Sequence, residues 1–194
     1  MPYVYFISHP EVVIDRAVPV TDWRLSDKGL ARLEKMLEQP WLKNITAVFS
    51  SNENKSVIAA KRVAEHLHLD FHKIEGLGEM DRSATGMLEP AEFELVVNEA
   101  FANPEQSIRG WERLVDAQTR IVKAVDQAMA VSAGSGDIVI VSHGGVGTLL
   151  ICKLKNIPIT RTEDQQGQGH YFKFNVTTKE LVHTWQKIDE LVLP

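Results

Sequence analysis

Two short apolar runs, separated by most of the chain, constrain the fold more than any other feature of this sequence. The first run is Tyr3-Val4-Tyr5-Phe6-Ile7, and the second is Ile138-Val139-Ile140-Val141. Runs of this length that are rich in β-branched or aromatic side chains predict buried strands. We therefore expect a sheet whose faces are covered by other elements.

Segments with strand and helix patterns alternate along the rest of the chain. Further strands are predicted at residues 45–49, 71–74, 171–174 and 181–185. Helices are predicted after Ser26, which is a good N-cap residue, through residues 57–67, and at residues 92–101, 104–132 and 146–154. Apolar residues recur at helical spacing through residues 104–132, Trp111 among them, and this stripe is interpreted as core packing.

Strands that alternate with helices favour a mostly parallel sheet with helices on both faces. The last two predicted strands form a hairpin, which adds an antiparallel edge. The predicted fold class is therefore α/β, a three-layer α/β/α sandwich with a mostly parallel central sheet and an antiparallel edge. A chain of 194 residues is long enough for one domain with a full core, and we expect a single domain over residues 1–194.

Charge and hydropathy narrow the classes of partner. The formal net charge of -5 gives no electrostatic reason to expect nucleic acid as a partner. No apolar stretch approaches the ~20 residues of a membrane span, so no membrane partner is expected. The N-terminal apolar run is short and lacks the basic flank of a signal peptide, and the expected location is the cytoplasm. The single cysteine, Cys152, lies among leucine and isoleucine residues and is interpreted as core.

A histidine stands directly after each of the two apolar runs. His9 lies in Ser8-His9-Pro10, and His143 lies in Ser142-His143-Gly144-Gly145. Ligands of open α/β sheets bind outside the carboxyl ends of the strands. The two imidazoles are therefore candidates to meet in one site.

Residues elsewhere in the chain supply anion binders and an acid. Ser50-Ser51-Asn52-Glu53-Asn54-Lys55 brings hydroxyls and a cation to the start of a predicted helix, which suits a phosphate or a carboxylate. Glu79 lies in a glycine-rich segment and is a candidate proton donor. Arg82, three residues later, is interpreted either as a second cation of the site or as a surface arginine. A nucleophile, anion binders and an acid are the groups needed for phosphoryl transfer through histidine.

Other chemistries have weaker support in the sequence. Metal-ligand spacings such as His-Glu-x-x-His and Cys-x-x-Cys are absent, so no metal and no cofactor are expected. A serine hydrolase would need a Gly-x-Ser-x-Gly elbow, and the chain has none. Dinucleotide binding would need Gly-x-Gly-x-x-Gly after a strand, which is also absent.

Five motifs, in order along the chain, resemble those of the histidine phosphatase superfamily, which is also called phosphoglycerate mutase-like. The family's Arg-His-Gly corresponds to Ser8-His9-Pro10 in this chain, and its Leu-Ser/Thr-x-x-Gly corresponds to Leu25-Ser26-Asp27-Lys28-Gly29. Its Ser-Ser, followed by an arginine on the next helix, corresponds to Ser50-Ser51 with Lys55. Its Leu-x-Glu and Ser-His-Gly-Gly correspond to Leu77-Gly78-Glu79 and Ser142-His143-Gly144-Gly145. The matches extend over residues 3–145, and the resemblance implies a phosphoglycerate mutase-like fold.

The resemblance also implies roles for individual residues. His9 would attack phosphorus and form a phosphohistidine, and Glu79 would protonate the leaving oxygen. His143 and Lys55 would bind the phosphoryl oxygens, with Ser8 and Arg82 as further phosphate-binding candidates. The expected activity is hydrolysis of a small phosphorylated substrate without a metal. Mutase activity is less expected, because the chain is short and shows no large insertion to shelter a phosphoenzyme from water.

The chain departs from the family pattern at three positions. Ser8 and Lys55 replace arginines, and Pro10 replaces a glycine. A hydroxyl and a point charge thus stand where the family has two planar, bidentate cations. An alternative function is therefore a weak or inactive family member that binds a phosphorylated ligand or a protein partner.

Overall fold

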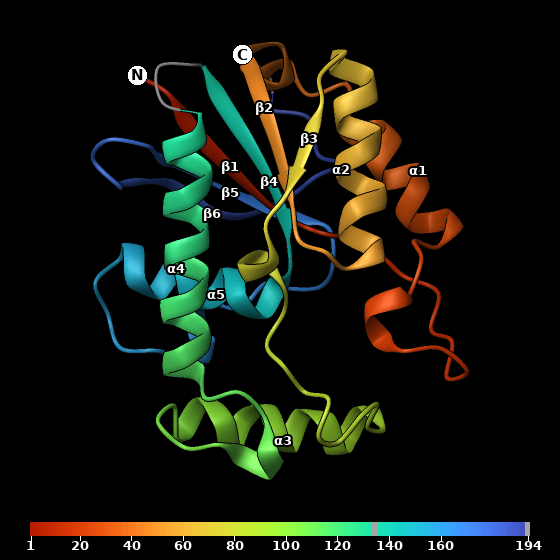
Figure 1. Ribbon diagram of the computed structural model, residues 1–194, viewed down its shortest axis with the longest axis vertical. Coiled ribbons are helices and arrows are strands. Elements are labelled where there is room, and N and C mark those ends of the chain that lie inside the picture. The colour runs from red at the N-terminus through yellow and green to blue at the C-terminus, as the bar shows by residue number, and fades with distance from the viewer. Residues whose placement is uncertain (133–135, 193–194) are drawn as a thin grey trace.

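The computed structural model describes residues 1–132 and 136–192, and a twisted sheet runs through its centre (Figure 1). The sheet has the order β3-β2-β4-β1-β5-β6. Its strands are β1 (Tyr3–Ser8), β2 (Ile45–Ser50), β3 (Phe71–Lys73), β4 (Asp137–Ser142), β5 (His170–Asn175) and β6 (Leu181–Lys187). The first four strands in that order pair in parallel, whereas β5 pairs antiparallel with both β1 and β6. The expected antiparallel edge is therefore present.

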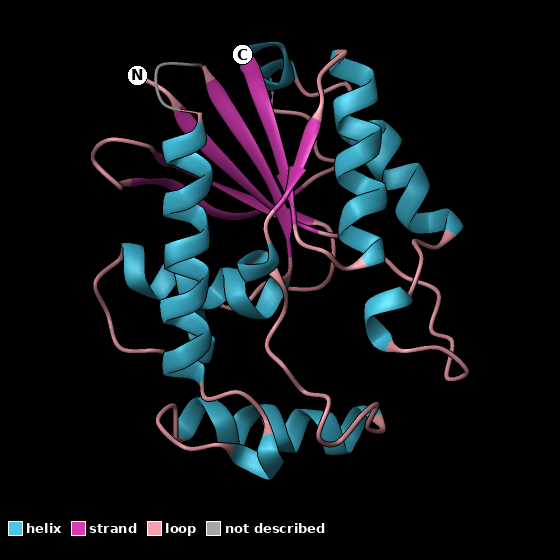
Figure 2. Ribbon diagram, viewed as in Figure 1, coloured by secondary structure: helices cyan, strands magenta, loops and turns pink. Residues whose placement is uncertain are grey.

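Helices cover both faces of the sheet (Figure 2). They are α1 (Asp27–Met36), α2 (Asn54–Leu67), α3 (Pro90–Ala102), α4 (Leu114–Val131) and α5 (Gly144–Leu154). Helices α1 and α2 lie on one face, and α4 and α5 lie on the other (Figure 1). Helix α3 lies beyond the end of the sheet, below the other elements in Figure 1. Short 3-10 turns, among them η1 (Val20–Asp22), η3 (Glu75–Leu77) and η4 (Ile108–Gly110), connect these elements.

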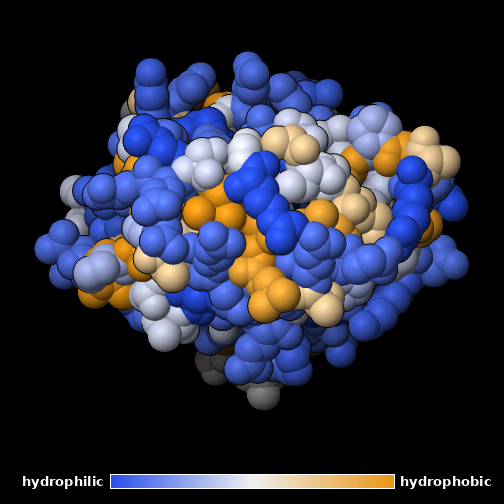
Figure 3. Space-filling model, turned by 90° about the horizontal axis from the view of Figure 1, so that it is seen from below, coloured by the Kyte–Doolittle hydropathy of each residue, from blue (hydrophilic) through white to orange (hydrophobic). Residues whose placement is uncertain are grey.

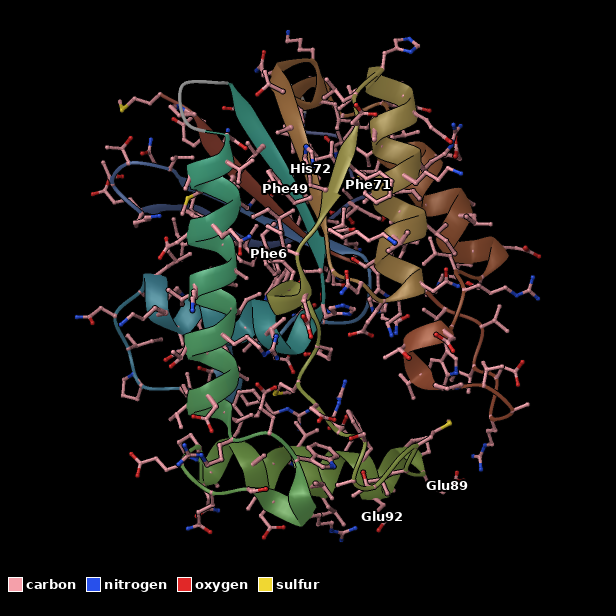
Figure 4. All side chains as sticks on the ribbon, viewed as in Figure 1. Phe6, Phe49, Phe71, His72, Glu89 and Glu92 are labelled. Atoms are coloured by element: carbon pink, nitrogen blue, oxygen red, sulfur yellow. The ribbon has the colours of Figure 1, made fainter. Side chains whose placement is uncertain are left out.

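Alternate residues of β1 belong to two separate cores. Val4 and Phe6, the second of which is labelled in Figure 4, pack into the core under α4 and α5, and Tyr5 and Ile7 pack into the core under α1 and α2. Successive side chains of a strand point to opposite faces, so a strand between two helical layers must be apolar at every position. This explains the continuous apolar run and confirms the three-layer α/β/α sandwich.

The predicted helix over residues 104–132 is wrong in its first third. The chain there forms η4, in which Arg109 has φ 51° and Gly110 has φ 82°. Two successive residues with positive φ cannot continue a right-handed helix. Helix α4 therefore begins only at Leu114, and Trp111 lies in the connection before it. Residues 134 and 135, in the turn expected before β4, lie outside the described residues.

None of the helices in the described part of the chain combines the length and the apolar character that crossing a membrane requires.

Candidate active site

The pairing of β1 with β4 brings the two histidines together. The strands are parallel, and Ser8 lies opposite Ser142, so the segments that follow β1 and β4 leave the sheet at the same edge. The backbone N–H of His9 donates to the carbonyl of Ser142 at 3.1 Å. The two imidazole rings lie edge to face, with centroids 5.3 Å apart.

The start of α1 fixes the loop that follows His9. Ser26 caps α1 by accepting from the Gly29 N–H, and both its backbone N–H and its hydroxyl donate to the Glu11 carbonyl. A Cβ atom on Gly29 would lie 2.2 Å from that carbonyl oxygen, so only glycine allows this approach. The Leu-Ser-x-x-Gly motif thus holds the backbone two residues beyond His9.

His9 is held as a neutral imidazole with a defined tautomer. Its Nδ1 lies 2.9 Å from the Pro10 carbonyl oxygen, which can only accept, so Nδ1 carries the proton. Burial and, to a lesser degree, the neighbouring His143 lower the pKa of His9 to about 3. The ring is therefore uncharged at neutral pH, and the lone pair resides on Nε2.

His143 stands at the N-cap of α5 and is completely buried. Its Nε2 lies 2.8 Å from the Ser51 hydroxyl and 3.2 Å from Oε1 of Glu53. Because a carboxylate only accepts, Nε2 is the donor to Glu53. Burial lowers the pKa of His143, although Glu53 and Glu79 act in the opposite direction. Its Nδ1 has no hydrogen-bond partner among the described residues.

Glu79 lies against the N-terminus of α5. Its carboxylate accepts from the N–H groups of Gly145 and Val146 at 3.0 and 3.1 Å, and from its neighbour Met80. A Cβ atom on Gly145 would lie 2.7 Å from Oε1 of Glu79, so the glycine permits this contact. Burial alone would raise the pKa of Glu79, but Arg82, His143 and the hydrogen bond from the Met80 N–H outweigh it and lower the pKa.

Glu53 joins the other groups of the site, and the sequence did not single it out. One oxygen accepts from the ammonium of Lys55 at 2.5 Å, and the other accepts from the backbone N–H of Glu79 at 2.8 Å. Lys55 is buried and also donates to the Val20 carbonyl. Burial would raise the pKa of Glu53, but His143 and Lys55 lower it to about 2. A carboxylate two residues before a lysine at a helix start is the sequence signal that indicates this pair.

Arg82 lies at the boundary between the charged groups and an aromatic wall. Its guanidinium is 3.8 Å from Glu79 and lies over the rings of Phe93 and Trp111, at 5.1 and 5.7 Å from their centroids. The partly buried guanidinium of Arg82 therefore lies next to the carboxylate that the sequence singles out as a proton donor.

Ser8 does not join these groups. Its hydroxyl donates to Oε1 of Gln165 at 2.5 Å, lies 3.2 Å from the His170 carbonyl oxygen, and accepts from the His170 N–H. The serine thus pairs with β5 and with the loop before it. Ser8 does not line the cavity that His9, His143 and Glu79 share.

One cavity of about 770 Å³ contains His9, His143, Glu79, Lys55 and Arg82, together with Glu53. Apolar side chains form most of the remaining wall. The face seen from below in Figure 3 shows hydrophobic surface gathered between hydrophilic side chains. Across the described residues, no group of three or more His, Cys, Asp and Glu side chains is arranged to hold a metal ion.

Comparisons with known proteins identify a family and agree with the fold. The family model described as Histidine phosphatase superfamily (branch 1) matches residues 4–182. No curated protein matches the chain. Among solved structures, the fold resembles mycobacterial glucosyl-3-phosphoglycerate phosphatase in complex with inorganic phosphate, with 17% identity, a TM-score of 0.76, and coverage of 96% of this chain and 95% of that chain.

Two further solved structures have the same fold. Bacillus stearothermophilus YhfR is 20% identical, with a TM-score of 0.77 and 95% of each chain covered. Phosphoserine phosphatase from Entamoeba histolytica, in complex with 3-phosphoglyceric acid, is 17% identical, with a TM-score of 0.77 and coverage of 96% of this chain and 98% of that chain.

Proposed function

The chain belongs to the histidine phosphatase superfamily, and this membership supports phosphatase activity. We propose that it hydrolyses phosphate monoesters through a phosphohistidine on His9. The single observation that carries the proposal is the state of His9. Its Nδ1 proton is engaged by the Pro10 carbonyl and its pKa is about 3, which leaves a nucleophilic Nε2 lone pair at neutral pH.

In the first step, the Nε2 lone pair of His9 attacks phosphorus in line with the ester oxygen. The N–P bond forms as the P–O bond of the ester breaks, and the departing oxygen takes a proton from Glu79. The products of this step are the free alcohol and a phosphohistidine.

In the second step, water attacks the phosphorus of the phosphohistidine. Glu79, now a carboxylate, accepts a proton from the water as the new P–O bond forms. The N–P bond breaks, its electrons return to Nε2, and inorganic phosphate is released. Each turnover therefore restores neutral His9 and protonated Glu79.

Glu79 must receive its first proton from outside the free protein, since its lowered pKa keeps it ionised. A phosphate monoester is a mixture of monoanion and dianion near neutral pH, because its second pKa is about 6. Binding of the monoanion beside Glu79 brings a proton with the substrate. The negative charge of the bound phosphate then raises the pKa of Glu79 and favours proton transfer to it.

Three groups bind the phosphoryl oxygens in this proposal. Arg82 supplies a guanidinium 3.8 Å from Glu79, and the unpartnered Nδ1 of His143 accepts a hydrogen bond from the P–OH group of the entering monoanion, before that proton passes to Glu79. Lys55 contributes after its ammonium exchanges part of its pairing with Glu53 for a phosphoryl oxygen. The hydroxyl of Ser8 is committed to β5 and has no part in the proposal.

The test is detection of the phosphoenzyme. Purified protein is mixed with ³²P-labelled phenyl phosphate, quenched in base and assayed for protein-bound label, which should be stable in base and labile in acid. His9→Gln should abolish both the label and the release of phosphate. His66→Gln is the matched control, because His66 is exposed on α2, and it should behave as the wild type does.

The Glu53–Lys55 ion pair favours a second candidate, a protein that binds a phosphorylated ligand without turnover, because it neutralises a cation of the site. In that case phenyl phosphate would bind, and no label would appear on the wild-type protein. That pair of results would contradict hydrolysis.

A further inference from the structure

The cavity around the two histidines is much larger than a phosphate group. Its volume of about 770 Å³ falls within the range of ~300–1,000 Å³ for pockets that bury drug-sized ligands. The groups of the proposed hydrolase lie together in one part of its wall. The rest of the wall therefore determines which alcohol part of a monoester fits.

Two apolar segments border the opening of the cavity. Ile14 and Val20 come from the connection between β1 and α1, and Met87 comes from the loop before α3. These three side chains are 61%, 38% and 36% exposed. Large apolar side chains that gather around one opening mark a surface for an apolar ligand. Figure 3 shows hydrophobic surface of this kind on the face below the sheet.

An aromatic pair forms the deeper part of the same wall. Phe93 of α3 and Trp111 have ring centroids 5.9 Å apart, and the indole N–H of Trp111 donates to the hydroxyl of Thr85 at 2.8 Å. The polar atom of Trp111 is thus satisfied by the protein, and its ring, which is only 3% exposed, supports the partly buried ring of Phe93 in the cavity wall. Arg82 lies over both rings with its guanidinium toward Glu79, which connects this wall to the phosphate-binding groups.

The charged residues of the described cavity lining include no unpaired cation that could bind a second anionic group of a substrate. Its described lining contains two permanent cations, Lys55 and Arg82, and three carboxylates, Glu53, Glu79 and Asp81. Lys55 is paired with Glu53, and Arg82 lies beside Glu79. One phosphate already competes with these carboxylates. A second carboxylate or phosphate on the substrate would be desolvated against apolar walls with no cation to pair with it.

We propose that the substrate is a phosphate monoester of an uncharged, apolar alcohol about the size of a substituted phenol or naphthol, with no second anionic group. This inference rests on the proposed function and adds the substrate class to it. The ring of the alcohol packs against Phe93, which Trp111 supports from behind, and its far end reaches the apolar residues at the opening.

Two esters of equal size separate charge from shape. The 4-isopropylphenyl and 4-carboxyphenyl phosphates differ only at the para position, which carries a branched alkyl group in the first ester and a planar carboxylate in the second. The phenol that bears the carboxylate is the better leaving group. Chemical reactivity alone therefore favours the 4-carboxyphenyl ester. We expect kcat/KM to be at least about tenfold higher for the 4-isopropylphenyl ester, because the other ester must desolvate an unpaired carboxylate. Equal values, or a preference for the 4-carboxyphenyl ester, would overturn the inference.

Phenyl phosphate distinguishes this failure from failure of the proposed function. If phenyl phosphate is hydrolysed and the 4-carboxyphenyl ester is at least as good as its partner, only the substrate class is wrong. If the wild type hydrolyses none of the three esters and forms no phosphoenzyme, the proposed function itself fails.

A cation introduced into the apolar wall should invert the preference. Met87→Lys places an ammonium at the opening, and kcat/KM should rise severalfold for the 4-carboxyphenyl ester and fall for the 4-isopropylphenyl ester. Leu95→Lys is the matched control, because Leu95 is 68% exposed on α3 and does not line the cavity. The same inversion in Leu95→Lys, or no change in Met87→Lys, would contradict an apolar substrate site at this wall.

Discussion

Glu53 gives the candidate phosphate site a permanent negative charge of its own. Its pKa of about 2 keeps it ionised across the physiological range. It holds the ammonium of Lys55 at 2.5 Å and lies 3.2 Å from Nε2 of His143. A phosphate that enters the cavity must therefore compete with a carboxylate already in place. Two like charges about 5 Å apart repel by roughly 3 kcal/mol at an effective dielectric constant of about 20.

Glu53→Gln should consequently tighten the binding of phosphate. The amide keeps the size of the side chain, removes the repulsion and frees Lys55 to bind a phosphoryl oxygen. We expect the competitive inhibition constant of inorganic phosphate to fall at least about tenfold, which is ~1.4 kcal/mol. Glu65→Gln is the control, since Glu65 is exposed on α2 and outside the cavity, and its inhibition constant should not change. Weaker phosphate binding in Glu53→Gln would mean that Glu53 acts mainly by favouring the protonated form of His143.

At this scale the sequence predicts positions better than contacts. His9 and His143 could be predicted as neighbours because both follow interior strands, and the strand register brings them together. The assignment of Ser8 to the phosphate site used its place next to His9. Successive residues of an extended chain point to opposite sides, and the hydroxyl of Ser8 pairs with β5 instead. The Glu53–Lys55 pair depends on two rotamers, which no spacing rule specifies.

Helix α5 holds a carboxylate at its N-terminus, where related α/β folds often hold a ligand anion. The N–H groups of Gly145 and Val146 both donate to Glu79. The positive end of the helix dipole therefore favours the ionised form of Glu79 and fixes its position. Gly145 of the Ser-His-Gly-Gly motif lets the loop that carries Glu79 pack directly on the helix backbone, and Gly144 makes room for the side chain of Gln165.

Gly145→Ala should displace Glu79 and slow catalysis. The added methyl group would lie 2.7 Å from Oε1 of Glu79, so the carboxylate must move away from α5. General acid–base groups contribute 10²–10⁴-fold, and we expect kcat for phenyl phosphate to fall about 100-fold. Gly78→Ala is the control: its Cβ atom would meet only ordinary contacts at 3.4 and 3.7 Å, and kcat should change little. Full activity in a folded Gly145→Ala variant would show that Glu79 does not act from this position.

The elements themselves were largely predictable, because interior strands and amphipathic helices have strong periodic signals. The error at residues 104–132 arose where apolar residues continued at helical spacing through a break in the backbone. Arg109 adopts a left-handed conformation that its residue type rarely favours, and Gly110 was the only local sign of it. The consequence reached the site, since Trp111 belongs to the core as expected but lies in the connection before α4, where it also lines the cavity.

The molecule as a whole carries a cost for its buried neutral histidines at low pH. His9 has an ordinary pKa of 6.5 when unfolded and a pKa of about 3 in the folded protein. As pH falls below 6.5, His9 binds a proton in the unfolded chain, whereas in the folded protein it stays neutral until about pH 3. The free energy of unfolding therefore decreases with falling pH across this window, by up to about 1.4 kcal/mol per pH unit.

His9→Gln should flatten this dependence. Glutamine does not titrate, so the loss of stability between pH 6 and pH 4 should be about 2 kcal/mol smaller in the variant than in the wild type. Urea unfolding at a series of pH values measures it. Only the slope is compared, because the substitution also changes packing. An unchanged slope in His9→Gln would mean that His9 is not held neutral in the folded protein.

The position of β1 also has a consequence for the order in which the protein can form during synthesis. Both neighbours of β1 in the sheet, β4 and β5, come late in the chain. At ~5–20 residues per second, a ribosome needs roughly ten seconds between making β1 and making β4. Throughout that interval the nascent chain exposes the apolar β1 segment without its neighbouring strands, and His143, the partner of His9, has not yet been synthesised. The nascent chain therefore has an interval in which chaperone binding or misassociation competes with folding, and this interval ends only when residues 137–142 emerge.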